Sequence, residues 1–135
     1  MENIVEKDIT GTIGTQKYAC TISWRKGQFI MDEPESIGGK NLGPDPYSAL
    51  LASLASCTLV TLRMYIDRKG WDIPEINIAV NAQQELEGEY ETIFSRKISF
   101  STDITIAQKE RLIQIANKCP VSNILKGKIT IKTQL

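Results

Sequence analysis

The chain has 135 residues, of which 41% are hydrophobic, and its 16 basic and 16 acidic residues give a formal net charge of zero. This length predicts a single domain, residues 1–135, that can bury its own core. The balanced charge gives no support to nucleic-acid binding, and the absence of histidine excludes a Ser-His-Asp hydrolase and a Cys–His nucleophile.

The amino-terminal third predicts a small antiparallel meander. Residues 3–10 have the character of a first strand, residues 17–25 alternate between apolar and polar positions, and residues 28–31 suit a short third strand. Cys20 falls on the apolar face of the second strand, which favours a role in packing. Residues 32–46 then form a glycine- and proline-rich loop whose length is typical of functional loops.

A long helix is predicted for residues 47–69, with Asp45 as its N-cap, Pro46 in its first turn and Gly70 as its stop. Apolar residues cover much of its circumference, so we expect the helix in the middle of the fold. Such a helix needs cover on several sides, which points to an obligate dimer. Its uncharged run, residues 46–62, is too short to span a membrane.

The second half predicts two further strands, a helix and a last strand. Residues 76–84 and 93–101 are joined by an acidic turn and should pair as a hairpin. Thr105 and Gln108 form a predicted capping box for a helix of about a dozen residues, and residues 128–133 suit a final strand. The order β-β-β-α-β-β-α-β predicts an α+β class with antiparallel hairpins.

Two of the cysteines are candidates for chemistry. Cys57 lies about three turns into the long helix, beyond the reach of the helix dipole, and its Ala, Ser and Leu neighbours are more typical of packing than of reactivity. Cys119 precedes Pro120, which suits the first position of a short helix over residues 121–126, so Cys119 would be its N-cap. Backbone N–H groups aimed at the sulfur favour a thiolate, and a buried cap or core residue is the alternative.

The spacing of the cysteines bears on metal and redox chemistry. No CxxC spacing occurs and no histidine could complete a site, so metal binding gets little support. Two thiols that are distant in sequence but able to meet in space suggest a redox cycle. In such a cycle one thiolate becomes a sulfenic acid, and the other condenses with it to a disulfide.

Two segments resemble the OsmC/Ohr family of osmotically inducible and organic hydroperoxide resistance proteins. They are the loop of residues 37–46 with the helix that carries Cys57, and residues 117–124 around Cys119. The order of elements fits as well, so the resemblance covers essentially the whole chain. It implies an OsmC-like fold, antiparallel sheets around a long central helix, in an intertwined homodimer with two sites at the subunit interface and no bound cofactor.

The resemblance also implies roles for individual residues. Cys57 corresponds to the peroxidatic cysteine and Cys119 to the resolving one. Peroxidase members carry an Arg that stabilises the thiolate and a Glu that holds this Arg, and here Tyr47 stands at the Glu position. Lys40 in the loop and Arg25 in the meander are the candidate cations. The implied substrates are organic and fatty-acid hydroperoxides, and the implied reductants are dithiols or lipoyl proteins.

These residues are compatible with three functions. The first is a thiol peroxidase in oxidative stress defence, with Tyr47, Leu50 and Leu54 lining the substrate site; it requires a Cys57 pKa below about 8.5. The missing Glu motivates the alternative, an OsmC-like stress or redox-linked binding protein with little turnover. The third treats all the cysteines as core residues. The amino terminus has mixed charge and no apolar signal core, so we expect a cytoplasmic protein without a membrane partner.

Overall fold

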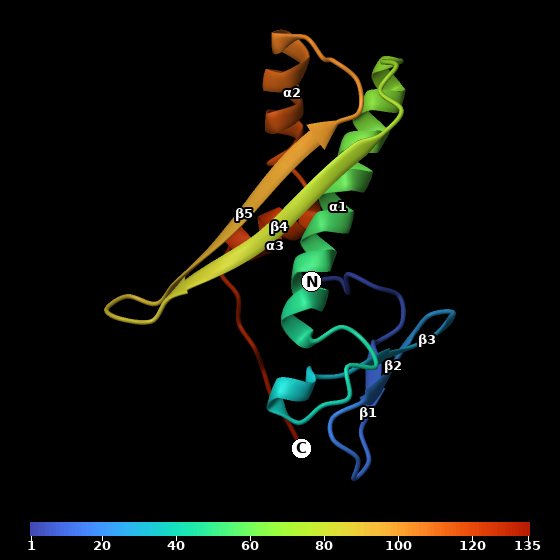
Figure 1. Ribbon diagram of the computed structural model, residues 1–135, viewed down its shortest axis with the longest axis vertical. Coiled ribbons are helices and arrows are strands. Elements are labelled where there is room, and N and C mark those ends of the chain that lie inside the picture. Colours follow the sequence, from blue (N-terminus) through green and yellow to red (C-terminus); the bar gives the residue numbers. More distant parts are fainter. The chain divides into compact units, whose positions relative to one another are not determined.

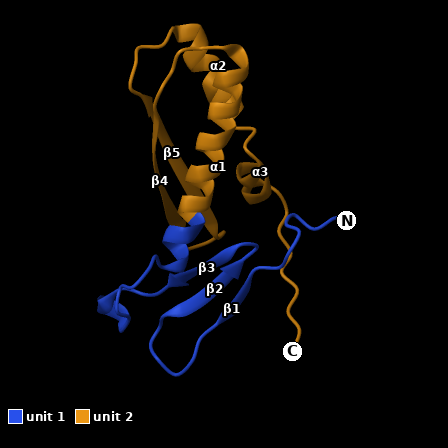
Figure 2. Ribbon diagram, turned by 90° about the vertical axis from the view of Figure 1, so that its right-hand side faces the viewer, with its two compact units in different colours: residues 1–50 blue, residues 51–135 orange.

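A computed structural model describes the whole chain, residues 1–135. The chain divides into two compact units, residues 1–50 and residues 51–135 (Figure 2). The long helix α1 (Pro46–Lys69) begins in the first unit and continues through the second (Figure 1). Each unit has its own antiparallel sheet, as the α+β prediction requires.

The first unit contains a three-stranded antiparallel sheet in the order β1-β2-β3. Its strands are β1 (Thr10–Thr12), β2 (Cys20–Trp24) and β3 (Gly27–Met31). The predicted strand over residues 3–10 is wrong except at its last residue, because only Thr10–Thr12 pairs with β2. Residues 1–9 are exposed and have no strand partner, so their apolar residues gain nothing from an extended conformation.

The predicted loop after β3 is organised by Asp32, a residue that the sequence analysis did not single out. Asp32 is only 2% exposed, and its carboxylate accepts hydrogen bonds from the backbone N–H groups of Tyr18, Glu33, Lys40 and Leu42. Burial acts to raise the pKa of Asp32, but these N–H groups together lower it. A Cβ at Gly39 would overlap the main chain of Glu33, which explains the glycine there.

Helix α1 begins and ends as predicted. The Asp45 carboxylate accepts hydrogen bonds from the Ser48 hydroxyl and from the Ser48 N–H, which lower the pKa of Asp45. Pro46 is the first helical residue, and Gly70 follows the helix at a φ of 68°. One face of α1 is buried, whereas Val60 and Met64 on the other side are 50% and 66% exposed.

The composition of α1 also meets the criteria for a membrane-crossing helix. It has 24 residues, and its most apolar window has a mean hydropathy of 1.6. The uncharged run of residues 46–62, which the sequence predicts to be too short for a span, is only part of this helix. Core helices of soluble proteins share these properties, so length and hydropathy do not separate the two classes here.

The second unit packs a β-hairpin and two further helices beside α1 (Figure 1). The core is formed by Leu62, Tyr65 and Ile66 of α1 together with Ile73 and the buried face of α2. Burial alternates along β4, so that Ile76, Ile78, Val80 and Ala82 form its inward face. The predicted Thr105–Gln108 capping box is present at the start of α2. The elements are β4 (Ile76–Glu85), β5 (Glu91–Phe100), α2 (Ile106–Ala116) and α3 (Pro120–Lys126).

The predicted last strand over residues 128–133 is wrong. These residues form no strand and pair with no other segment in the chain. Ile131 is 85% exposed. A β-strand is stable only where another strand completes its hydrogen bonds, and residues 128–133 have no such partner. The secondary structure therefore ends with α3.

Candidate functional site

Cys119 lies at the start of α3, where the sequence predicts an N-cap. Pro120 occupies the first turn, and the Cys119 Sγ accepts a hydrogen bond from the Ser122 N–H at 3.4 Å. The side chain is completely buried. Because an amide N–H can only donate, this contact stabilises a charged sulfur more than a neutral one.

Thr58 approaches Cys119 from α1. Its hydroxyl is fully buried and lies 3.8 Å from the Cys119 Sγ and 2.7 Å from the Leu54 carbonyl oxygen. A hydroxyl has one proton, so Thr58 can donate to the carbonyl or to the sulfur but not to both at full strength. Thr58 therefore offers the Cys119 sulfur a second donor.

Arg96 reaches the same sulfur from β5. Its Nη1 donates to the Thr58 hydroxyl at 2.9 Å and to the Ala116 carbonyl at 3.1 Å, and it lies 4.0 Å from the Cys119 Sγ. Its Nη2 donates to the Asn117 Oδ1 at 3.2 Å. All of these oxygen partners are neutral. The half-buried guanidinium of Arg96 therefore makes hydrogen bonds but no ion pair with a carboxylate.

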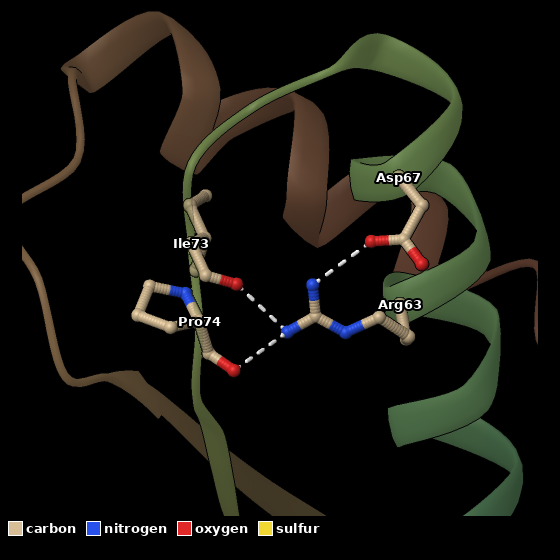
Figure 3. Close-up of polar contacts among 4 residues, drawn as sticks. All are labelled: Arg63, Asp67, Ile73 and Pro74. Carbon is tan, nitrogen blue, oxygen red and sulfur yellow. Dashed lines mark hydrogen bonds and ion pairs between the residues drawn. The ribbon is translucent and has the colours of Figure 1, made fainter.

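A second half-buried arginine shows the contrast. Arg63 on α1 donates to the Asp67 carboxylate at 3.0 Å and to the carbonyl oxygens of Ile73 and Pro74 at 2.7 and 3.1 Å (Figure 3). The Arg63–Asp67 contact is the only ion pair in the chain. Arg63 and Arg96 both bind backbone carbonyls. Only Arg96 lies beside a thiol, and only Arg96 has no carboxylate partner.

Arg96 was not predicted as a site residue, although the β5 pattern contains a signal for it. Phe94, Ile98 and Phe100 alternate along the half-buried face of β5, and this face continues through Arg96, which pairs with Val80 on β4. A charged residue at an inward strand position needs a polar environment. Period-two alternation on β5 therefore identifies Arg96 as a candidate for the site.

Cys57 is half-buried on α1, next to the Cys119 thiol. Burial raises the pKa of Cys57, and the Cys119 sulfur raises it further. A backbone hydrogen bond from Val121 acts in the opposite direction and lowers the pKa in part. Burial also acts to raise the pKa of Cys119, but the Ser122 N–H and hydroxyl, the Cys57 thiol and the Thr58 hydroxyl lower it to about 7.

The Cys119 sulfur is stabilised by more hydrogen-bond donors than the Cys57 sulfur, from Ser122, Thr58 and Cys57. On balance the pKa of Cys57 is raised, by burial and by the Cys119 sulfur, whereas the peroxidase hypothesis expects a lowered one.

The remaining predicted residues are spread over both units. Leu54 is buried in the second unit, one turn before Thr58. Arg25 places its guanidinium over the Trp24 ring, 5.1 Å from the ring centroid. The others belong to the first unit, residues 1–50: half-buried Cys20 and the exposed Lys40, Tyr47 and Leu50.

A cavity of about 660 Å³ adjoins the thiol site between β5 and α2. Arg96, Ala116 and Asn117 line it and also surround Cys119. The other walls are apolar side chains of the core, with Lys97, Lys109 and Asp103 among the polar groups. Its volume is typical of pockets for small organic ligands. Neither Cys57 nor the predicted wall residues Leu50 and Leu54 line it.

Comparison with known proteins gives a family and a fold. The family model described as OsmC-like protein matches residues 38–134. An OsmC-like protein from Mycoplasma pneumoniae is 23% identical, with a TM-score of 0.70 over 93% of this chain and 90% of its own. No curated protein sequence matches the chain.

Two further structural neighbours carry functional names. An organic hydroperoxide resistance protein from Elizabethkingia anophelis is 22% identical, with a TM-score of 0.68 over 94% of this chain and 92% of its own. The organic hydroperoxide resistance protein OhrB of Bacillus subtilis is 20% identical, with a TM-score of 0.63 over 93% of both chains. Identities this low establish the fold alone.

Proposed function

This chain belongs to the OsmC-like protein family, and we propose that it is a thiol peroxidase that reduces organic hydroperoxides with Cys57 and Cys119. The proposal is carried by the mutual influence of the two thiols, each of which shifts the pKa of the other. They come from α1 and from the start of α3, and one is half-exposed while the other is buried. This is the arrangement that a disulfide-forming redox pair needs.

The exposure of the thiols supports Cys57 as the sulfur that meets the peroxide. Cys57 attacks the distal oxygen of the hydroperoxide, the O–O bond breaks, and the alcohol leaves with a proton while Cys57 becomes a sulfenic acid. Cys119 then attacks the Cys57 sulfur, which forms the S–S bond and releases water. An external dithiol or lipoyl protein reopens the disulfide by exchange.

The proposed assembly is a homodimer that works in the cytoplasm. The exposed Val60 and Met64 leave one side of the long apolar helix α1 without cover in the single chain. A second copy of the chain would bury this side, as an obligate dimer does. A reducing compartment would keep the three free cysteines reduced between turnovers. Lys40, Arg25 and Tyr47 remain proposed contributors from the first unit.

A single-turnover experiment tests the peroxidase. The reduced protein should consume cumene hydroperoxide faster than hydrogen peroxide, and Cys57→Ser should abolish consumption. Cys119→Ser should consume at most one equivalent and stop at a sulfenic acid, which mass spectrometry detects. Cys20→Ser is the matched control and should retain full turnover. Consumption of the organic peroxide no faster than by a free thiol would contradict the proposal.

The cavity beside Arg96 favours a second candidate function, binding of a small organic anion. Its apolar walls and its three cations, Arg96, Lys97 and Lys109, set against Asp103, suit an amphipathic carboxylate. Calorimetry with dodecanoate tests this candidate, with Lys109→Gln expected to weaken binding and Lys128→Gln, outside the cavity lining, as the control. Binding without peroxide consumption would favour this candidate over the peroxidase.

A further inference from the structure

We propose that Arg96 is a positioning residue for disulfide formation: it ties the residue after Cys57 to the turn before Cys119, so that Cys119 captures the oxidised Cys57 before a second hydroperoxide reaches it. This inference rests on the proposed peroxidase function. The bridge itself is a feature of the reduced chain, and its effect on the joining of the two sulfurs can be measured without peroxide.

The bridge runs from the helix that carries Cys57 to the turn that leads into α3. Thr58 directly follows Cys57 on α1, and its hydroxyl accepts a hydrogen bond from the Arg96 Nη1 at 2.9 Å. At the other end, the same Nη1 donates at 3.1 Å to the carbonyl of Ala116, the last residue of α2. Cys119 follows Ala116 by three positions and is the N-cap of α3. One guanidinium therefore holds both segments that carry the sulfurs.

The shape of the guanidinium suits this bridge. Its Nη2 donates to the Asn117 Oδ1 at 3.2 Å, so the two terminal nitrogens of Arg96 fix the turn at two neighbouring residues. The contact that Thr58 itself makes with the Cys119 sulfur is longer, at 3.8 Å, and sulfur is a weak acceptor. Arg96 also lies 4.0 Å from that sulfur, so the bridge passes beside the atom that it positions.

Stability alone does not require a charged residue at this position. Every oxygen that Arg96 contacts is neutral, and the half-buried guanidinium has no carboxylate partner. Burial of a cation without an acid costs free energy, and apolar side chains of similar volume fill such positions at a lower cost. An arginine adds a planar fork of donors with fixed directions, which is the property that positioning uses.

The chemistry of the disulfide step makes position important. After the first attack, Cys57 is a sulfenic acid. The Cys119 sulfur attacks the Cys57 sulfur, the S–S bond forms, the S–O bond breaks, and the oxygen leaves as water with the Cys119 proton. A second hydroperoxide competes for the Cys57 sulfur: it transfers an oxygen atom, leaves as the alcohol, and yields a sulfinic acid that a dithiol does not reduce. A misplacement of about 1 Å slows reactions between oriented groups by about 100-fold.

A disulfide-exchange experiment tests the bridge without peroxide. In a Cys20→Ser background, dithiobis(nitrobenzoate) converts the half-exposed Cys57 to a mixed disulfide and releases one thionitrobenzoate. Cys119 then attacks the Cys57 sulfur and displaces the second thionitrobenzoate, and the first-order rate of this release measures how well the two sulfurs are placed. Arg96→Gln should slow the second release about 10-fold or more. Arg63→Gln is the matched control and should leave it unchanged.

Two further variants separate position from charge. Arg96→Lys keeps the charge but has a single nitrogen, which cannot span Thr58, Ala116 and Asn117, so the second release should stay slow. Asn117→Ala leaves Arg96 and its charge in place and removes one anchor on an exposed side chain, which should slow the release about 3-fold. If circular dichroism shows that Arg96→Gln does not fold, Asn117→Ala decides.

The outcomes separate this inference from the proposed function. An unchanged second release in Arg96→Gln or in Asn117→Ala, a full recovery in Arg96→Lys, or no second release from the parent protein would overturn the positioning role. If the protein is a peroxidase, Arg96→Gln should accumulate the Cys57 sulfinic acid several-fold faster under excess cumene hydroperoxide with dithiothreitol, as mass spectrometry measures. Equal accumulation would also overturn the role. Exchange as expected without peroxide consumption would overturn only the proposed function.

Discussion

Arg96 on β5 and Thr58 on α1 are joined by a 2.9 Å hydrogen bond between residues 38 positions apart in the sequence. This bond ties the strand that carries the cation to the helix that carries Cys57. The Ala116 carbonyl accepts from the same Nη1 atom, so the end of α2 is held at the same point. The thiol pair therefore lies where three elements meet, and their relative positions set the environment of Cys119.

Replacement of Thr58 tests this junction. Thr58→Val keeps the shape of the side chain but removes the acceptor for Arg96 and the donor to Cys119. Because one N–H of the half-buried Arg96 Nη1 then loses its acceptor, while the other keeps the Ala116 carbonyl, the free energy of unfolding should fall by about 1–3 kcal/mol in urea titrations. Thr58→Ser retains the hydroxyl and should recover most of this loss. Equal losses in both variants would show that packing of the methyl group, rather than the hydrogen bond, stabilises the junction.

The stability of the protein should depend on the ionisation of Cys119. Its pKa is lowered from 9.0 to about 7 in the folded chain. A lowered pKa adds stability that is complete above the unfolded pKa and is lost as the pH falls through the folded one. In a Cys57→Ser background, the free energy of unfolding should rise between about pH 7 and pH 9 by at most about 2 kcal/mol. Cys57→Ser/Cys119→Ser should not show this rise.

Cys57→Ser is the necessary background because the two thiols act in opposite directions. Burial and the Cys119 sulfur raise the pKa of Cys57, so Cys57 removes stability as the pH rises. A rise of equal size in the double variant would show that Cys119 is not the group responsible.

The elements that could be predicted are those whose signals are local. Asp45, Pro46 and Gly70 mark the ends of α1, and Thr105 with Gln108 marks the start of α2. The caps and proline positions depend on neighbouring backbone groups alone, so one sequence is enough to find them. The wrong strands, at residues 3–10 and 128–133, depend on distant pairing partners, which local apolar character does not reveal.

The residues of the candidate site also divide into those with a local sequence signal and those that depend on distant parts of the chain. Cys119 as an N-cap could be predicted because Pro120 follows it directly. Arg96 could not be joined to Cys119 because a strand pattern identifies a face and not the group that meets it. The ionisation of the pair depends on which sulfur has more hydrogen-bond donors, and those donors come from α1, β5 and α3.

If the exposed side of α1 is a dimer interface, a charged residue placed on this side should prevent the dimer from forming. Met64→Asp places a carboxylate on a side chain that is 66% exposed in the single chain. A dimer that buries this side would have to desolvate the charge at a cost of several kcal/mol. Sedimentation should show a dimer for the unmodified protein and monomers for Met64→Asp, with Lys109→Asp on α2 as a dimeric control. A monomeric unmodified protein would contradict the proposed assembly.

The loop after β3 should lose its order in acid. The Asp32 carboxylate accepts hydrogen bonds from the N–H groups of Tyr18, Glu33, Lys40 and Leu42. Burial opposes ionisation of Asp32, but these bonds lower its pKa below 3.8. The stabilisation by Asp32 is therefore complete above the unfolded pKa and is lost as the pH falls through the lower folded pKa.

Asp32→Asn tests this dependence, because the amide has one acceptor oxygen and no charge. The backbone amides of Lys40 and Leu42 should exchange faster with deuterium in Asp32→Asn than in the unmodified protein near neutral pH. The difference should shrink as the unmodified protein is acidified and its own carboxylate is protonated. Asp8→Asn, at an exposed position, is the control and should leave exchange unchanged. Equal protection in Asp32→Asn at neutral pH would show that the glycine contacts hold the loop without the carboxylate.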